Sequence, residues 1–184
     1  MVARVGITSD ELKQKYDFIG REEEGYRPVK RNGRWGFIDS EDREICSLSY
    51  EDVYSFSEGY TRVKLNSRWG LMNRYGEVVS EIKYDRIFAM KDGYCVVSLW
   101  NKWAVINHEG REICDFKYDN VWNLSEGIFI VQQNEKRGFM NVYGREICAL
   151  KYDYAEPFKN GLARVNEGSN WYMINYFGEE IMKW

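Results

Sequence analysis

The alternation of hydrophobic and polar positions predicts short β-strands. Residues 60–65, Tyr-Thr-Arg-Val-Lys-Leu, alternate polar with apolar side chains, and residues 68–73, Arg-Trp-Gly-Leu-Met-Asn, follow after only Asn66 and Ser67. A period of two is typical of a half-buried strand, and two such runs joined by two turn-forming residues predict a β-hairpin.

Two further segments surround this hairpin. Residues 73–76, Asn-Arg-Tyr-Gly, are predicted to form a turn, because glycine readily adopts the positive φ that such a turn needs. The residues that follow, Glu-Val-Val-Ser at 77–80, are predicted to form another short strand. Residues 50–56 are compatible with either a strand or an irregular turn. The Asn-x-x-Gly turn recurs at 107–110, 141–144 and 175–178.

The chain repeats itself every 34 residues. Tryptophan recurs in one phase, with arginine in its place once: Trp35, Trp69, Trp103, Arg137 and Trp171. Three residue types hold their position in every repeat: Tyr16, Tyr50, Tyr84, Tyr118 and Tyr152; Gly25, Gly59, Gly93, Gly127 and Gly161; Val29, Val63, Val97, Val131 and Val165. The repeats are therefore 15–48, 49–82, 83–116, 117–150 and 151–184.

This organisation predicts an all-β protein, a tandem array of five 34-residue repeats built on β-hairpins. Such short strands cannot bury their faces alone, so each repeat must pack on its neighbours. Residues 1–14 are expected to be an N-terminal capping segment, in which a helical turn over residues 9–15 covers the edge of the first repeat. A capped first repeat favours an open superhelical, solenoid-like stack. A closed five-bladed β-propeller is the alternative.

The recurring motifs resemble the WG repeat family. They include Trp35-Gly36-Phe37-Ile38-Asp39, Lys83-Tyr84-Asp85 and Phe56-Ser57-Glu58-Gly59-Tyr60-Thr61-Arg62-Val63. The pattern departs from the family at Ala104 and Tyr172, which replace its glycine, and at Arg137, which replaces its tryptophan. The resemblance implies a mostly bacterial, β-rich repeat used as an accessory or interaction module, and it brings no catalytic motif.

Composition narrows the functional classes. Twenty-six Lys and Arg against 29 Asp and Glu give a net charge of −3 without a basic cluster, which disfavours nucleic-acid binding. No apolar run is long enough to span a membrane, and the first residues lack the apolar core of a signal peptide, so we expect a cytoplasmic protein with reduced thiols. The charge run at residues 21–24 is expected to be a solvated loop.

No constellation of residues predicts catalysis, a cofactor or a metal. The only histidine, His108, falls in an Asn-x-x-Gly turn without triad partners nearby in sequence. Three cysteines share one repeat position at spacings that match no zinc motif: Cys46, Cys114 and Cys148. An acidic residue recurs once per repeat and is expected to fix its own turn by hydrogen bonding: Asp17, Glu51, Asp85, Asp119 and Asp153. We therefore expect a protein that is not an enzyme.

Candidate partner-binding residues are large or charged residues at positions that vary between repeats. Trp100 occupies a hairpin turn where other repeats have Asn or Gly. Tyr54, Phe88 and Trp122 share one repeat position, and they form either an exposed stripe or ordinary core between repeats. Arg137, in place of a tryptophan, either opens a pocket or binds an acidic partner. Tyr, Trp and Arg are common anchors of protein interfaces.

The leading hypothesis is a non-enzymatic module that binds another protein, as an inhibitor or a toxin-neutralising protein that occludes its partner. The alternatives are a carbohydrate-binding repeat protein and an enzyme whose site is unrecognised. A homodimer through the last strand, residues 181–184, is a further expectation because an unpaired sheet edge can pair with a second chain.

Overall fold

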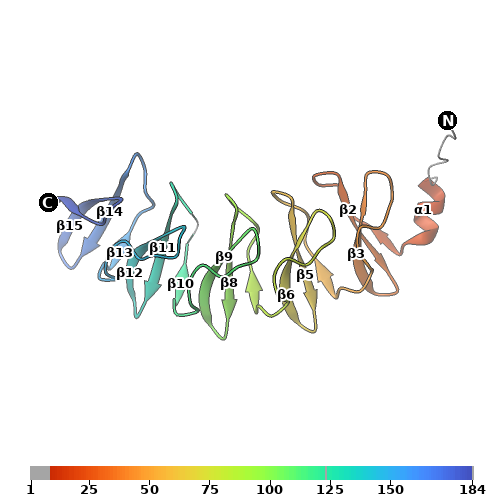
Figure 1. The fold of residues 1–184 in the computed structure, drawn as a ribbon, viewed down its shortest axis with the longest axis horizontal. Helices are drawn as coiled ribbons and strands as arrows, with labels where there is room; N and C mark the ends of the chain where they lie inside the picture. The colour runs from red at the N-terminus through yellow and green to blue at the C-terminus, as the bar shows by residue number, and fades with distance from the viewer. Residues whose placement is uncertain (1–8, 123, 184) are drawn as a thin grey trace. The chain divides into compact units, whose positions relative to one another are not determined.

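The structure, a computed structural model, describes residues 9–122 and 124–183. In this part of the chain one short helix precedes strands that pair into five antiparallel sheets (Figure 1). The elements are α1 (Ser9–Lys15), β1 (Phe18–Ile19), β2 (Tyr26–Arg31), β3 (Arg34–Asp39), β4 (Asp52–Val53), β5 (Tyr60–Leu65), β6 (Arg68–Asn73), β7 (Arg86–Ile87), β8 (Tyr94–Leu99), β9 (Lys102–Asn107), β10 (Asn120–Val121), β11 (Ile128–Gln133), β12 (Lys136–Asn141), β13 (Tyr154–Ala155), β14 (Leu162–Glu167), β15 (Asn170–Asn175) and β16 (Glu180–Lys183). The predicted all-β array of hairpin repeats is confirmed, and it fits a β-solenoid or a propeller-like fold.

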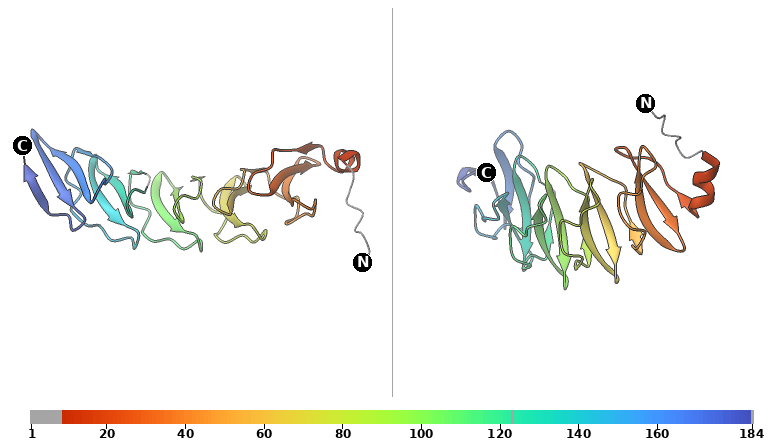
Figure 2. Two further views of the ribbon diagram at one scale, coloured as in Figure 1. Left: turned by 90° about the horizontal axis from the view of Figure 1, so that it is seen from above. Right: turned by 45° about the vertical axis from the view of Figure 1, so that its right-hand side comes forward.

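The chain forms two compact units, one ending at Gly93 and the other beginning at Tyr94. Views from two further directions show each hairpin as a sheet of its own, with the orange β2–β3 and the yellow β5–β6 in the first unit (Figure 2).

The hairpin predicted at residues 60–73 is present. β5 pairs with β6 in a register that runs from Tyr60 opposite Asn73 to Leu65 opposite Arg68. Asn66 and Ser67 both adopt positive φ, at 51° and 63°, as expected of the tight two-residue turn that suits the twist of paired strands.

The predictions for the two flanking segments were less accurate. Residues 77–80 were predicted as a strand, but within them only Val78 forms a bridge, to Met72. The corresponding residues of the last repeat do form a strand, β16, which pairs with β15. β16 ends its sheet, and the expected pairing of this edge with a second chain stays a prediction. Residues 50–56 contain only the two-residue strand β4.

Apolar faces of successive hairpins pack against each other in both units. In the first unit Phe37 meets Phe56 of the next repeat edge to face, with ring centroids 5.0 Å apart. In the second unit Phe139 meets Phe158 in the same way at 5.0 Å. These rings are buried, so the contact between neighbours supplies the core that one hairpin lacks.

The helical turn expected at residues 9–15 is confirmed as α1. Its Leu12 and the following Tyr16 are buried in a cluster with Val29 and Ile38, so the helix covers apolar surface of β2 and β3. Residues 1–8 of the expected capping segment lie outside the described residues. No helix of the described chain is long and apolar enough to cross a membrane.

Glutamates join successive repeats through their turns. The Glu24 carboxylate accepts hydrogen bonds from the backbone N–H groups of Glu58 and Gly59, each at 2.7 Å. Glu58 binds Asp92 and Gly93 in the same way, and Glu126 accepts from Asn160 and Gly161. We call this arrangement the carboxylate clamp. It corrects the expectation that Glu24 belongs to a purely solvated loop.

The recurring acidic residue beside the repeated tyrosine holds the hairpin turn of its own repeat, as predicted. Asp17 accepts a hydrogen bond from Asn32 N at 2.7 Å, and Asp119 accepts one from Asn134 N at 2.7 Å. Asp119 also pairs with Lys102 of the preceding repeat at 2.5 Å. The carboxylates are therefore structural.

Three glycines of the Asn-x-x-Gly turns, Gly76, Gly144 and Gly178, lie directly against the preceding repeat. Gly76 has φ +78°, and a Cβ atom there would lie 1.9 Å from the carbonyl oxygen of Ile45. The same approach occurs at Gly144, whose Cβ would lie 1.7 Å from Ile113 O. Only a residue without a side chain fits both the conformation and the space.

Candidate functional site

Trp100 lies at the tip of the hairpin formed by β8 and β9. Its side chain is 78% exposed, and its φ of +49° belongs to the tight turn that joins the strands. His108 is also exposed, in the turn that follows β9. The two residues therefore belong to the surface, and neither fills the core.

In the first unit, Tyr54 and Phe88 each keep about half of their surface exposed. The Tyr54 ring lies 5.1 Å from the Trp69 ring, centroid to centroid, and the Arg62 guanidinium carbon lies 3.6 Å from the Tyr54 centroid. Tyr54 thus takes part in a small exposed surface of two aromatic rings and a cation.

In the second unit, Arg137 lies close to two aromatic rings. Its guanidinium carbon is 4.8 Å from the Trp122 ring and 5.1 Å from the Tyr154 ring. Trp122 is half-buried and packs against the core cluster that contains Phe139 and Phe158. The structure therefore brings together two of the residues selected from the sequence, Trp122 and Arg137, and adds Tyr154.

Within the described residues, no carboxylate lies within ion-pair distance of Arg137. Its Nε is buried and has no hydrogen-bond partner in that part of the chain. The terminal nitrogens of a guanidinium match a carboxylate in geometry and charge, so Arg137 is suited to bind one beside these two rings. We call Trp122, Arg137 and Tyr154 the arginine clip.

Lysine, tyrosine and glutamate form a repeated polar cluster next to the core. In repeat 4 the Lys117 ammonium lies 2.8 Å from Glu146, and the Tyr118 hydroxyl donates to Glu146 at 2.7 Å. Burial acts to raise the pKa of Glu146, but the bonds from Lys117 and Tyr118 outweigh it and lower that pKa. Burial, supported by the bond to Glu146, raises the pKa of Tyr118.

The same cluster recurs in repeats 1 and 5, which argues for a structural role. Tyr16 donates to Glu44 at 2.9 Å, and Tyr152 donates to Glu180 at 3.2 Å. In repeat 2, Ser49 and Val78 occupy the positions of the lysine and the glutamate. A phenol and a carboxylate whose pKa values are driven apart in this way do not exchange a proton near neutral pH.

The cysteines are free thiols, and burial governs their chemistry. It raises the pKa of Cys46 to about 11, so the protonated, unreactive thiol prevails at neutral pH. Among residues 9–122 and 124–183, no three His, Cys, Asp or Glu side chains gather closely enough to hold a metal ion.

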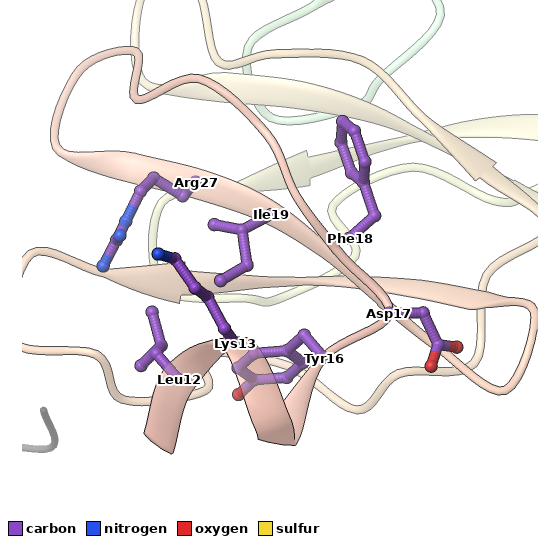
Figure 3. Close-up of a pocket in the computed structure, with 7 residues that line it drawn as sticks. All are labelled: Leu12, Lys13, Tyr16, Asp17, Phe18, Ile19 and Arg27. Carbon is purple, nitrogen blue, oxygen red and sulfur yellow. The ribbon is translucent and has the colours of Figure 1, made fainter. Parts of the chain in front are cut away.

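A pocket of about 460 Å³ lies beside α1 and β1 (Figure 3). Leu12 and Lys13 of the helix line it together with Ile19 and Arg27. Arg27 forms an ion pair with Asp42, so its charge is already matched within the protein.

Two further pockets lie between corresponding turns of successive repeats, and the sequence did not predict them. One of about 400 Å³ is lined by Tyr26, Asp39, Arg43, Glu44, Ile45, Arg74 and Tyr75. The other, of about 290 Å³, is lined by Asn141, Arg145, Glu146, Ile147, Tyr176 and Phe177. The signal in the sequence that could have indicated them is an aromatic residue that recurs directly before the turn glycine. The exposed fraction of these side chains is 74% for Tyr75, 86% for Tyr143 and 81% for Phe177.

A family model described as a WG containing repeat matches the chain five times, at residues 13–35, 35–69, 69–103, 103–136 and 138–171. No curated protein is similar enough to count as a relative. Among solved structures, Hsv2p of Kluyveromyces lactis is 10% identical with a TM-score of 0.43, over 90% of this chain and 63% of that one. A eukaryotic initiation factor is 9% identical with a TM-score of 0.47, over 89% of this chain and 52% of the other. The chain spans less than two thirds of these structures, and at such TM-scores they do not define its fold.

Proposed function

Since the chain belongs to the WG repeat family, with five matched repeats, we propose that it is a non-enzymatic module that binds another protein. Repeat arrays keep their shared positions for packing and leave the variable positions open for recognition. In this chain the tyrosine and glycine shared by all repeats lie in the core and the turns, and the glutamate found in three repeats forms the carboxylate clamp.

The observation that carries the proposal is the arginine clip. Arg137 stands where other repeats have tryptophan, and it holds a positive charge beside Trp122 and Tyr154 with no carboxylate of the described chain within ion-pair distance. An acidic side chain of a partner would supply the missing charge, and the rings would add apolar contact. Arginine and large aromatic side chains contribute most of the binding energy in many interfaces.

The finer proposal is that binding occludes the partner, so that the chain acts as an inhibitor or a toxin-neutralising protein in the cytoplasm. Four free cysteines fit a reducing compartment. Trp100, Tyr54 and Phe88 are further exposed candidates for contact.

The test begins with affinity capture by the tagged chain and identification of retained proteins by mass spectrometry. The Kd of a purified candidate is then measured by calorimetry against wild type, Trp122→Ala and Arg137→Trp. Arg137→Trp restores the residue of the other repeats, so it removes the charge while suiting the fold. We expect its Kd to rise about tenfold or more, the loss of one charge-assisted contact.

Arg34→Gln removes an exposed hairpin-turn charge in the first unit and serves as the matched control, with an unchanged Kd. An unchanged Kd for both Trp122→Ala and Arg137→Trp would show that the arginine clip is not the binding site. Inhibition is tested separately, by assaying the partner's activity with an equimolar amount of the chain, and undiminished activity would refute occlusion.

A further inference from the structure

The two pockets between the turns of successive repeats are copies of one groove. A shift of 102 residues, which is three repeats of 34, converts Asp39, Arg43 and Ile45 into Asn141, Arg145 and Ile147. It also converts Tyr75 into Phe177. We call them the repeat 1/2 groove and the repeat 4/5 groove, after the repeats whose turns form them.

The groove arises from the close stacking of the turns. Gly76 lies against Ile45 O and Gly178 against Ile147 O, so each turn projects the aromatic residue before its glycine beside the arginine of the preceding repeat. Gly144 lies against Ile113 O in the same way, so the turns of repeats 3 and 4 have the same construction.

Arginine and the aromatic residue occur together at these junctions. The pairs are Arg43 with Tyr75, Arg111 with Tyr143, and Arg145 with Phe177. In the remaining case neither residue is present: Glu77 takes the arginine's position in repeat 2, and Glu109 takes the aromatic position in repeat 3. For the two pairs that line pockets, no cation–π contact joins the guanidinium to the ring within the described residues, so the groups stand on either side of open space. Direct packing between them therefore does not explain why they occur together.

In two repeats the turn itself neutralises the arginine. The Arg43 guanidinium lies 2.9 Å from Glu41 and 2.7 Å from Asp39. Arg111 lies 3.1 Å from Glu109. In each case the acid stands two residues before the arginine, at the exposed tip of the turn.

Repeat 4 lacks this acid. Tyr143 replaces the glutamate and Asn141 replaces the aspartate, and no carboxylate of the described chain lies within ion-pair distance of the Arg145 guanidinium. Glu146 lines the same groove, but Lys117 and Tyr118 already bind its carboxylate. The repeat 4/5 groove thus presents a cation without its acid beside the exposed Phe177 ring, and the exposed Tyr143 belongs to the same turn as Arg145.

We propose that the repeat 4/5 groove binds a glutamate or aspartate side chain from an extended segment of the partner protein. The incoming carboxylate takes the place that Glu109 holds beside Arg111, and an adjacent apolar side chain lies on the Phe177 or Tyr143 ring. The occupant is assigned as polypeptide because the group that fills the equivalent position in repeats 1 and 3 is itself a glutamate side chain. This inference rests on the proposed protein-binding function and adds a second contact to it, apart from the arginine clip.

The test uses a defined probe and needs no knowledge of the partner. The ¹⁵N-labelled full chain is titrated with the blocked peptide Gly-Phe-Glu-Phe-Gly and with its matched control Gly-Phe-Gln-Phe-Gly, and amide chemical shifts are followed by NMR. We expect saturable shifts at residues 141–147 and 176–178 with the Glu peptide. We expect binding about tenfold weaker with the Gln peptide, as for the loss of one charge-assisted contact.

Three variants locate the contact. Arg145→Gln should weaken binding of the Glu peptide to the level of the Gln peptide, whereas Arg43→Gln, at the groove whose arginine is already paired, should leave it unchanged. Tyr143→Glu should also weaken binding, because it gives Arg145 an internal acid like those of repeats 1 and 3. Tyr143→Gln is the uncharged control and should retain more affinity than Tyr143→Glu.

Equal binding of the two peptides, or undiminished binding by Arg145→Gln, would overturn the proposal. Saturable shifts with an oligosaccharide of galacturonic acid but none with the Glu peptide would overturn it in favour of an acidic glycan. The outcome is distinguishable from failure of the proposed function, because the Kd measurements on Arg137→Trp concern a different site.

Discussion

Two adjacent positions of the same turn behave in opposite ways. Gly76 is pressed against the backbone of the preceding repeat, where a single Cβ atom would lie 1.9 Å from Ile45 O. Tyr75, one residue earlier, is 74% exposed. The glycine recurs in repeats 2 to 5, whereas the neighbouring position is Tyr, Glu, Tyr or Phe in those repeats.

The comparison separates the positions that stack repeats from those that face a ligand. A position that meets the next repeat tolerates little change, because interiors are close-packed and backbone contacts cannot yield. A position at the tip can change without disturbing that contact. Recurrence of a residue from repeat to repeat therefore identifies scaffold positions within a single sequence.

The largest expected effect is that of Gly76→Ala. The added methyl group meets Ile45 O and the residue must adopt φ +78°, so we expect a loss of about 3–5 kcal/mol in the free energy of unfolding. Thermal or urea unfolding measures it. Gly33→Ala is the matched control, because Gly33 has φ +77° but no atom within 4 Å of the added Cβ, and it should cost only about 1 kcal/mol. Similar losses for the two variants would contradict the close contact.

A smaller effect is expected from the polar cluster behind the turn. Glu146→Gln removes the carboxylate that binds Lys117 and Tyr118, and we expect a loss of about 1–2 kcal/mol at pH 7. The folded protein lowers the pKa of Glu146, so its stabilisation is complete above the ordinary carboxyl value of 4.5 and disappears as the pH falls through the lower folded value.

Urea unfolding from pH 7 to pH 3 therefore should show wild type and Glu146→Gln converging in acid. Glu135→Gln, an exposed hairpin-turn glutamate in the same repeat, is the control and should follow wild type throughout. A difference between wild type and Glu146→Gln that persists at pH 3 would contradict the assigned ionic role.

The carboxylate clamp should contribute less. Glu58→Ala removes the acceptor for the N–H groups of Asp92 and Gly93, which water can partly replace at this exposed turn, so we expect a loss of about 1 kcal/mol. Glu58→Gln keeps an acceptor oxygen and should lie between the alanine variant and wild type. Equal free energies of unfolding in urea for all three proteins would show that the carboxylate clamp does not stabilise the fold.

The smallest effect on stability is expected at the tip itself. Tyr75→Ser should change the free energy of unfolding by no more than about 0.5 kcal/mol, because the ring is largely exposed. A clear loss in thermal unfolding would mean that the ring packs on the fold, and the contrast with Gly76 would fail.

Much of the fold could be predicted because the same pattern occurs in five repeats, so a secondary structure that is uncertain in one repeat is indicated by the others. The hairpin at residues 60–73, the helical turn at 9–15 and the turn-holding role of Asp17 all followed from local patterns. The strand predicted at residues 77–80 was wrong, because a short apolar run does not reveal whether a neighbouring strand pairs with it.

The candidate site was less predictable, because it depends on contacts between repeats. The sequence singled out Trp122 and Arg137 without showing that they touch, and it missed Tyr154, which comes from the following repeat. The clamp formed by Glu24 was also missed, since a glutamate in a charged loop carries no sign of a partner 34 residues later. The pairing of Arg145 with Phe177 across a groove was visible in the sequence only once the stacking of the turns was known.

The carboxylate clamp has a consequence for how such proteins can evolve. Its glutamate binds a backbone N–H group 34 residues further along the chain: Glu24 binds Glu58 N, and Glu126 binds Asn160 N. The two partners are therefore always one repeat apart in the sequence. An in-frame duplication of residues 117–150 would copy the clamp, the turn glycine and the Arg145 groove together, and each junction would find its complement. Unequal recombination could therefore change the number of repeats, and with it the number of grooves, one repeat at a time, and no new interface between repeats would have to evolve.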